Sequence, residues 1–188
     1  MPQLSHFDIS PRVSVSLHIS IFEGGNALSP FRIQQILPLL QAISPQIQGL
    51  QSRYVHLAAS LASLNTASQK TLAALLTYGE PSVCQDAGKL IVVSPRMGTV
   101  SPWASKATDI AHNCGLDIKR IERITEFSVQ LKNGLLSKAV LNIDQLAAVA
   151  DALLQDATHH GDLEVKLLQP VRQFLKQKHS TQYARAQT

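Results

Sequence analysis

The chain of 188 residues repeats one order of predicted elements: a strand, a helix, a second strand and a second helix. A Ser-Pro-aromatic triplet stands before the first helix of each copy, at residues 29–31 and 101–103, which are 72 residues apart. Serine is a favoured N-cap and proline suits the first helical turn, so both triplets predict the start of a helix. The strands that follow begin at Ile47 and Ile118, 71 residues apart. A repeat of this size predicts two similar halves that complete each other's core.

The predicted elements follow from hydrophobic periodicity and from capping residues. Apolar and polar residues alternate in one segment, which predicts a half-buried strand. This strand and the other three predicted strands span residues 14–22, 47–58, 89–94 and 118–131. The predicted helices begin at residues 29, 66, 101 and 142, with Asn142 or Asp144 near the cap of the last one. The last three of these helices end near Tyr78, Gly115 and Gln155.

Two details of these elements are less regular. Pro38 stands inside the first predicted helix, and we expect it to break or kink that helix. In the last predicted strand, the spacing of Ile118, Ile121, Ile124 and Phe127 does not follow a period of two. We expect these four side chains to share faces of the sheet around a β-bulge.

This pattern predicts an α+β fold, with antiparallel sheets that have helices packed on one face. Either half alone would have a small core, and pairing of the halves would bury a sheet face that a single half leaves wet. The predicted boundaries are residues 13–83 for the first half and 84–158 for the second. Residues 1–12 are expected to be a loose N-terminal extension, and residues 159–188 a basic C-terminal tail or a divergent linker.

The composition favours a globular protein without a nucleic-acid partner. Hydrophobic residues make up 45% of the chain and charged residues 16%, which is enough for a buried core and excludes global disorder. The formal net charge of +4 comes from the C-terminal end. Residues 1–164 contain 12 Lys and Arg against 13 Asp and Glu, while residues 165–188 contain five basic and no acidic residues. No aromatic residues alternate with a basic stripe, so nucleic-acid binding is not expected.

The sequence also favours a cytoplasmic protein. Its first residues do not have the basic and apolar regions of a signal peptide, and no apolar run reaches about 18 residues, so no membrane span is expected. The two cysteines, Cys84 and Cys114, are expected to be reduced thiols.

Candidate catalytic and metal-binding residues do not converge. Asp109, His112 and Cys114 are close in sequence, but on a helix they spread over more than one face, whereas a metal site needs convergent ligands. Neither Ser101 nor Cys114 stands in the sequence context of a nucleophile. The Gly-Gly-Asn turn at residues 24–26 lacks the basic residue and the helix of a phosphate loop. The sequence therefore predicts no catalytic, cofactor-binding or metal-binding residue in this chain.

Polar residues are dense in the segment from residue 96 to residue 109, which also contains Trp103. Two interpretations stay open: Trp103 anchors an interface with another domain, or it fills the core of its own domain while its polar neighbours are solvated. The first interpretation predicts an interdomain interface made of Arg96, Thr99, Ser101, Trp103, Lys106 and Asp109.

The run LIVVSPRMGTVSPWASKATDIAHNCGLDIKRIER, at residues 90–123, strongly resembles the N-terminal domain of the long, single-chain phosphoribosylformylglycinamidine synthase, also called FGAR amidotransferase. Ser94, Met97, Val100 and Ala104 depart conservatively from the family pattern. The segments GGNALSPFRI, SRYVHL and LAALLTYGEP agree with the family as well. The resemblance covers about residues 19–155.

This resemblance implies a fold of two fused PurS-like subdomains. The whole enzyme is an ATP-dependent ligase of purine (IMP) biosynthesis that converts FGAR, glutamine and ATP to FGAM, glutamate, ADP and phosphate. The resemblance implies that ATP, Mg²⁺ and the glutaminase residues belong to other domains. This chain would then have no cofactor and no catalytic role of its own. Its implied partners are the synthetase and glutaminase domains, in cis or in trans, which it would bridge.

The resemblance to the family ends near Asp156. It leaves open an excised domain, a truncated gene product or one part of a split enzyme. The alternative function is a free-standing protein-interaction module without ligase activity.

Overall fold

The computed structural model describes residues 16–82, 88–96, 98–132, 139–157 and 163–166. The described residues form a strand, a helix, a strand and a helix, then the same order again, and a final short strand. In chain order these are β1 His18–Glu23, α1 Pro30–Ile43, β2 Ile47–Ser60, α2 Thr66–Leu76, β3 Lys89–Pro95, α3 Pro102–Asn113, β4 Arg120–Leu131, α4 Ile143–Ala157 and β5 Leu163–Lys166.

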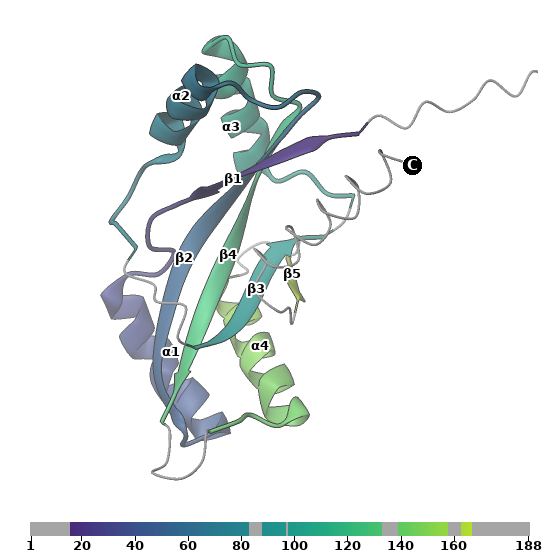
Figure 1. Cartoon of the computed structure of the whole chain (residues 1–188). Helices are drawn as coiled ribbons and strands as arrows, with labels where there is room; N and C mark the ends of the chain where they lie inside the picture. Colours follow the sequence, from purple (N-terminus) through teal and green to yellow (C-terminus); the bar gives the residue numbers. More distant parts are fainter. Residues whose placement is uncertain (1–15, 83–87, 97, 133–138, 158–162, 167–188) are drawn as a thin grey trace, which may run out of the picture.

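The strands form one antiparallel sheet in the order β1-β2-β4-β3-β5 (Figure 1). The two long strands, β2 and β4, pair at its centre, while β1 and β3 flank them. The predicted α+β class is confirmed. The expectation of separate sheets is wrong for the described residues, because β2 and β4 join the two halves into one sheet. A duplication behind the repeated order stays a prediction, as do the boundaries of the halves.

All four helices pack on the same face of this sheet, as predicted. One core cluster joins α1 and α4 to the sheet and includes Leu40, Phe127 and Leu153. A second cluster joins α2 and α3 to the other end of the sheet and includes Leu72 and Ile121. Phe127 and Ile121 are six residues apart on β4, an even spacing that puts both side chains on one face. The sheet therefore holds two helix pairs, one at each end (Figure 1).

Ile124 lies on the opposite face, where it packs with Val55 and Val92. The expectation that it shares a face with Ile121 and Phe127 is wrong. The reason is that the pairing of β4 with β2 runs without interruption through this region. The only register shift in this pair lies at the far end of β2, between Ile47 and Gly49.

The helix starts agree with their predicted caps. The hydroxyl oxygen of Ser29 accepts a hydrogen bond from the Arg32 amide at 3.3 Å, and that of Ser101 accepts one from the Ala104 amide at 3.0 Å. The side chain of Asn142 caps α4 in the same way. Helix α3 ends before Gly115, whose φ of 74° is a backbone conformation that favours glycine.

Helix α1 continues through Pro38 to Ile43, so the predicted break does not occur. The proline ring removes one backbone hydrogen bond of the helix, with the carbonyl four residues earlier. Pro38 is exposed, so water can satisfy the carbonyl left free on that side. Ile36 and Leu40, on either side of the proline, are buried and hold the helix against the sheet.

Some expectations concern residues that are described only in part. Residues 163–166, within the predicted basic tail, form β5 and pair with β3 at the edge of the sheet. The predicted extension at residues 1–12, the rest of the tail, Cys84 and Met97 lie outside the described residues.

A buried ion pair joins the two central strands on the face opposite the helices. Arg53 of β2 and Glu126 of β4 are direct cross-strand partners, and Nε of Arg53 lies 2.6 Å from Oε2 of Glu126. Arg53 is 8% exposed and Glu126 is 2% exposed. Since neither charge can be solvated well at this depth, removal of one of the two is expected to destabilise the fold.

We predict that Glu126→Gln lowers the free energy of unfolding by about 3 kcal/mol, because it replaces the buried carboxylate that accepts from Nε of Arg53 with a neutral amide. Urea denaturation followed by circular dichroism measures the change. As the matched control, the double variant Arg53→Met/Glu126→Met removes both charges and should recover most of the loss. Equal denaturation midpoints for Glu126→Gln and the wild type would contradict the prediction.

Candidate functional site

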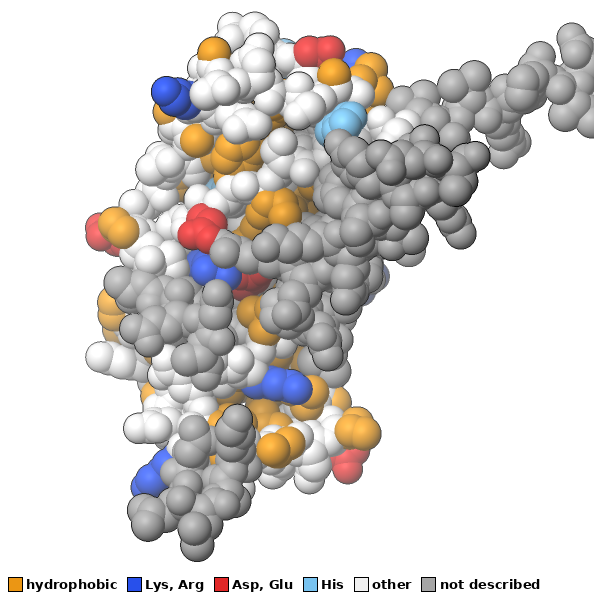
Figure 2. Space-filling view, viewed as in Figure 1, with side chains coloured by type: hydrophobic (Ala, Val, Ile, Leu, Met, Phe, Trp, Pro, Cys, Tyr) orange, Lys and Arg blue, Asp and Glu red, His pale blue; other side chains and the backbone are white. Residues whose placement is uncertain are grey.

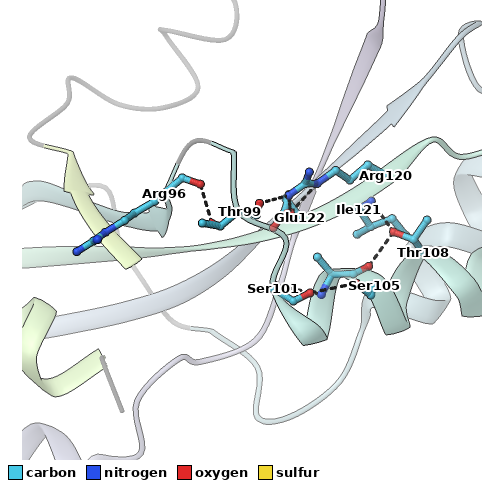
Figure 3. A network of polar contacts seen from close by, with 9 residues as sticks. Arg96, Thr99, Ser101, Ser105, Thr108, Arg120, Ile121 and Glu122 are labelled. Carbon is cyan, nitrogen blue, oxygen red and sulfur yellow. Dashed lines mark hydrogen bonds and ion pairs between the residues drawn. The ribbon is translucent and has the colours of Figure 1, made fainter. Parts of the chain in front are cut away.

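The six residues of the predicted interface lie on the loop before α3 and on α3 itself, and their contact with another domain stays a prediction. Arg96 and Thr99 belong to a polar network on the loop before α3 (Figure 3). The Thr99 hydroxyl donates to the Arg96 carbonyl at 2.7 Å, and the Thr99 carbonyl accepts from Nη2 of Arg120 at 2.7 Å. Arg120 is also paired with Glu122 on β4. This network fixes the loop to the sheet, which gives Thr99 a local structural role.

Ser101 and its neighbours position α3. Ser101 is the N-cap of the helix, and its carbonyl also accepts a bond from the Ser105 hydroxyl. One turn later, the Thr108 hydroxyl donates to the Ala104 carbonyl at 2.7 Å and accepts from the Ile121 amide at 3.0 Å. Many of the polar groups of this segment therefore bond within the loop and the helix, and Thr108 also joins α3 to β4 (Figure 3).

Trp103 packs into an aromatic cluster, defined here as Tyr54, His56, Tyr78, Trp103 and Arg123. The Trp103 ring stacks on the His56 ring, with centroids 5.3 Å apart and an angle of 26° between the planes. Cζ of Arg123 lies 4.6 Å from the centroid of the Trp103 ring and 4.2 Å from that of Tyr54. A guanidinium above aromatic faces at this distance is a favourable cation–π arrangement.

His56 lies at the centre of this cluster and is fully buried. Its Nε2 is 2.9 Å from the Tyr78 hydroxyl, which also accepts a hydrogen bond from Nη1 of Arg123 at 3.2 Å. Burial lowers the pKa of His56 from its ordinary 6.5 to about 4, and the positive charge of Arg123 adds to the decrease. His56 is therefore neutral at pH 7. Its Nδ1 is buried and has no hydrogen-bond partner in the structure.

The Gly-Gly-Asn turn packs directly against this cluster. A Cβ atom on Gly24 would lie 2.6 Å from Cε1 of His56, and one on Gly25 would lie 2.5 Å from the carbonyl oxygen of Glu80. Such distances are too short for any side chain, so both positions need glycine. The turn is thus a close-packing element that supports His56 and Tyr78.

Helices α2 and α3 leave an apolar groove of about 230 Å³ between them. We call this the α2–α3 groove. Trp103 and Lys106 line it, together with residues of α2 and β4, whereas Asp109 is exposed on α3 outside it. The structure shows Trp103 packed against the core of its own domain, while its role as an interface anchor stays a prediction. One side of the indole packs in the core of its own domain, and the side chain also forms a wall of a surface groove.

Sequence reasoning did not predict that His56, Tyr78 and Arg123 lie together. Their signal was present but indirect, since they lie in or beside the family-like segments SRYVHL, LAALLTYGEP and IKRIER. No local spacing links them, because they come together only through the pairing of β2 with β4.

In the parts of the chain that the structure describes, no three or more His, Cys, Asp or Glu side chains come together in a group that could hold a metal ion. Nε2 of His112 donates to the Ile118 carbonyl, and Cys114 is exposed at the end of α3. Backbone carbonyls close the Gly-Gly-Asn turn where a phosphate loop would be open.

None of the described helices has the length and apolar character needed to cross a membrane.

In the comparison with protein families, the model of the formylglycinamide ribonucleotide amidotransferase N-terminal region matches residues 53–165, more than half of the chain. The match runs from β2 to β5. It includes the five residues of the aromatic cluster and the α2–α3 groove.

We predict that the free energy of unfolding falls by about 3 kcal/mol as the pH decreases from 6.5 towards 4, through His56 alone. The pKa of His56 is depressed to about 4 in the folded chain, so the unfolded chain binds more protons in this window. Above pH 6.5 His56 is neutral in both states and does not lower the free energy of unfolding. The free energy of unfolding falls as the pH decreases from 6.5 to the pKa of about 4 that His56 has in the folded chain. Urea denaturation at a series of pH values measures this dependence.

The variant His56→Phe tests the assignment, because it keeps an aromatic ring in the stack and removes the titration. Its stability should vary less with pH than that of the wild type over this window. Tyr78→Phe is the matched control, since it loses a hydroxyl but keeps the buried imidazole. A wild-type pH dependence in His56→Phe would show that other groups cause it.

Proposed function

Because the chain belongs to the family of N-terminal domains of formylglycinamide ribonucleotide amidotransferase, we propose that it is an assembly domain of this purine-biosynthesis enzyme. The domain holds the synthetase and glutaminase parts together and helps to shape the route by which ammonia passes between them. The complete enzyme converts FGAR, glutamine and ATP to FGAM, glutamate, ADP and phosphate. ATP and Mg²⁺ bind to the synthetase part in this proposal, and the whole assembly is cytoplasmic.

The observation that supports an assembly role is the α2–α3 end of the molecule. Three large apolar side chains are exposed there around the half-buried Trp103: Tyr78 is 37% exposed, Val100 is 56% exposed and Ile110 is 46% exposed. Figure 2 shows hydrophobic side chains at the surface between polar neighbours at this end. Aromatic side chains and arginine are enriched in protein interfaces, and this end of the molecule has the Trp103 and Tyr78 rings together with the Arg123 guanidinium.

The chain's own described residues supply packing rather than chemistry in this proposal. Arg120 and Thr99 fix the loop before α3, Ser101 caps the helix, and the aromatic cluster holds Trp103 in place. These contacts give α3 a fixed position relative to the sheet. A rigid surface loses little conformational entropy when a partner docks on it.

We predict that the 188-residue chain forms a complex with the synthetase and glutaminase polypeptides of the same cell. Size-exclusion chromatography of the purified proteins detects the complex, and glutamine-dependent FGAM formation reports its activity. Activity should require all parts, while each part alone should lack it. Failure of the purified chain to bind either polypeptide would favour the free-standing interaction module instead.

We also predict that Trp103→Ala weakens this complex by about 2 kcal/mol or more, because it removes a large aromatic side chain from the proposed contact. Titration calorimetry measures the dissociation constant. Trp103 also packs against His56, so the thermal midpoint of the variant must be measured beside it. Trp103→Phe keeps a ring in the stack and is the control for lost core packing. Unchanged affinity in a folded Trp103→Ala variant would remove Trp103 from the interface.

A further inference from the structure

We propose that the α2–α3 groove receives one bulky apolar side chain from an acidic segment of the amidotransferase outside this chain. The inference rests on the proposed assembly function and names the surface and the chemistry of the segment that docks there. Its support comes from the size of the groove, its preformed walls and its charge.

The size of the groove fits a side chain better than a small-molecule ligand. Its volume of about 230 Å³ is below the range of roughly 300–1,000 Å³ that is typical of small-molecule sites. Its floor consists of buried core residues, Leu72, Leu76 and Ile121. Ile110 and Tyr78 form parts of its rim and are 46% and 37% exposed. A groove between two helices with an apolar floor and a partly exposed apolar rim is the kind of surface that binds an anchoring side chain.

The walls of the groove are held before any partner arrives. Trp103 is stacked on His56 and covered by the Arg123 guanidinium. The Tyr78 hydroxyl is fixed by His56 and Arg123. Because these two walls are already ordered, docking costs little side-chain entropy, which favours a specific contact over a nonspecific apolar one.

The charge of the groove selects an acidic partner. Lys106 is the one charged residue among those that line it, and within the described parts of the chain its ammonium group forms no ion pair. The residues of helix α2 that line the opposite wall, Leu72, Leu75 and Leu76, carry no charge. A carboxylate next to the apolar anchor would therefore meet a positive and unpaired rim, which favours association and correct orientation.

The same charge argues against two other occupants. A second copy of this chain that docked groove to groove would bring one Lys106 ammonium near the other. The C-terminal residues 165–188 carry five basic and no acidic residues, so they would be repelled by Lys106 as well. An acidic segment of another part of the enzyme would be attracted to Lys106 and would avoid both of these repulsions.

The experiment compares matched variants of the full 188-residue chain in calorimetric titrations with the purified synthetase and glutaminase polypeptides. Ile110→Asp places a carboxylate at the groove and should raise the dissociation constant about 30-fold. Its control is Leu39→Asp, the same change at an exposed leucine of α1, which should bind like the wild type. Lys106→Glu should raise the constant about tenfold, whereas Lys89→Glu, with the same change of net charge, should not.

Each outcome has one meaning. Weak binding by Ile110→Asp and Lys106→Glu, with both controls unchanged and all variants folded by circular dichroism, supports the inference. Wild-type binding by both groove variants overturns it and leaves the assembly function standing. Weak binding by Ile110→Asp alone overturns the acidic character of the partner. Absence of binding by the wild type overturns the assembly function and the inference together.

Discussion

The antiparallel pairing of β2 with β4 is the constraint on which the rest of the structure depends. Each of these strands belongs to a different half of the repeated order, and their pairing makes one sheet of both halves. The pairing places all four helices on one face, since the inward residues of both strands are then on the same side. It also brings Arg53 opposite Glu126, so two charges that would be costly if buried alone are buried together.

The same pairing assembles the candidate site. His56 and Arg123 are direct cross-strand partners, and they bring together Tyr78 from the first half and Trp103 from the second. A shift of the register by one residue would move the side chain of Arg123 to the opposite face and leave the Tyr78 hydroxyl and the Trp103 ring without it. The aromatic cluster is therefore a property of the paired halves, and neither half contains it alone.

The parts of the structure that local chemistry decides could be predicted from the sequence. Ser29, Ser101 and Asn142 cap helices because a short polar side chain can reach a backbone amide within its own turn. The parts that depend on distant pairing could not. Ile124 faces away from the helices because β4 keeps its register with β2, although its spacing in the sequence suggested otherwise. The cluster around His56 is of this second kind, because Tyr78, Trp103 and Arg123 are far from His56 in the chain.

The α2–α3 groove also depends on the pairing of β2 with β4. One of its walls is α2, from the first half, and the other is α3, from the second, with Ile121 of the central strand between them. A segment docked there can bind only the chain in which both halves are paired, so its binding energy adds to the stability of the sheet by mass action. In an assembly domain, this linkage would make the fold of the domain and the assembly of the enzyme support each other. The buried, neutral His56 connects the fold of the domain with the groove. It contacts Trp103 and Tyr78 inside the domain, and both of these side chains line the groove at the surface.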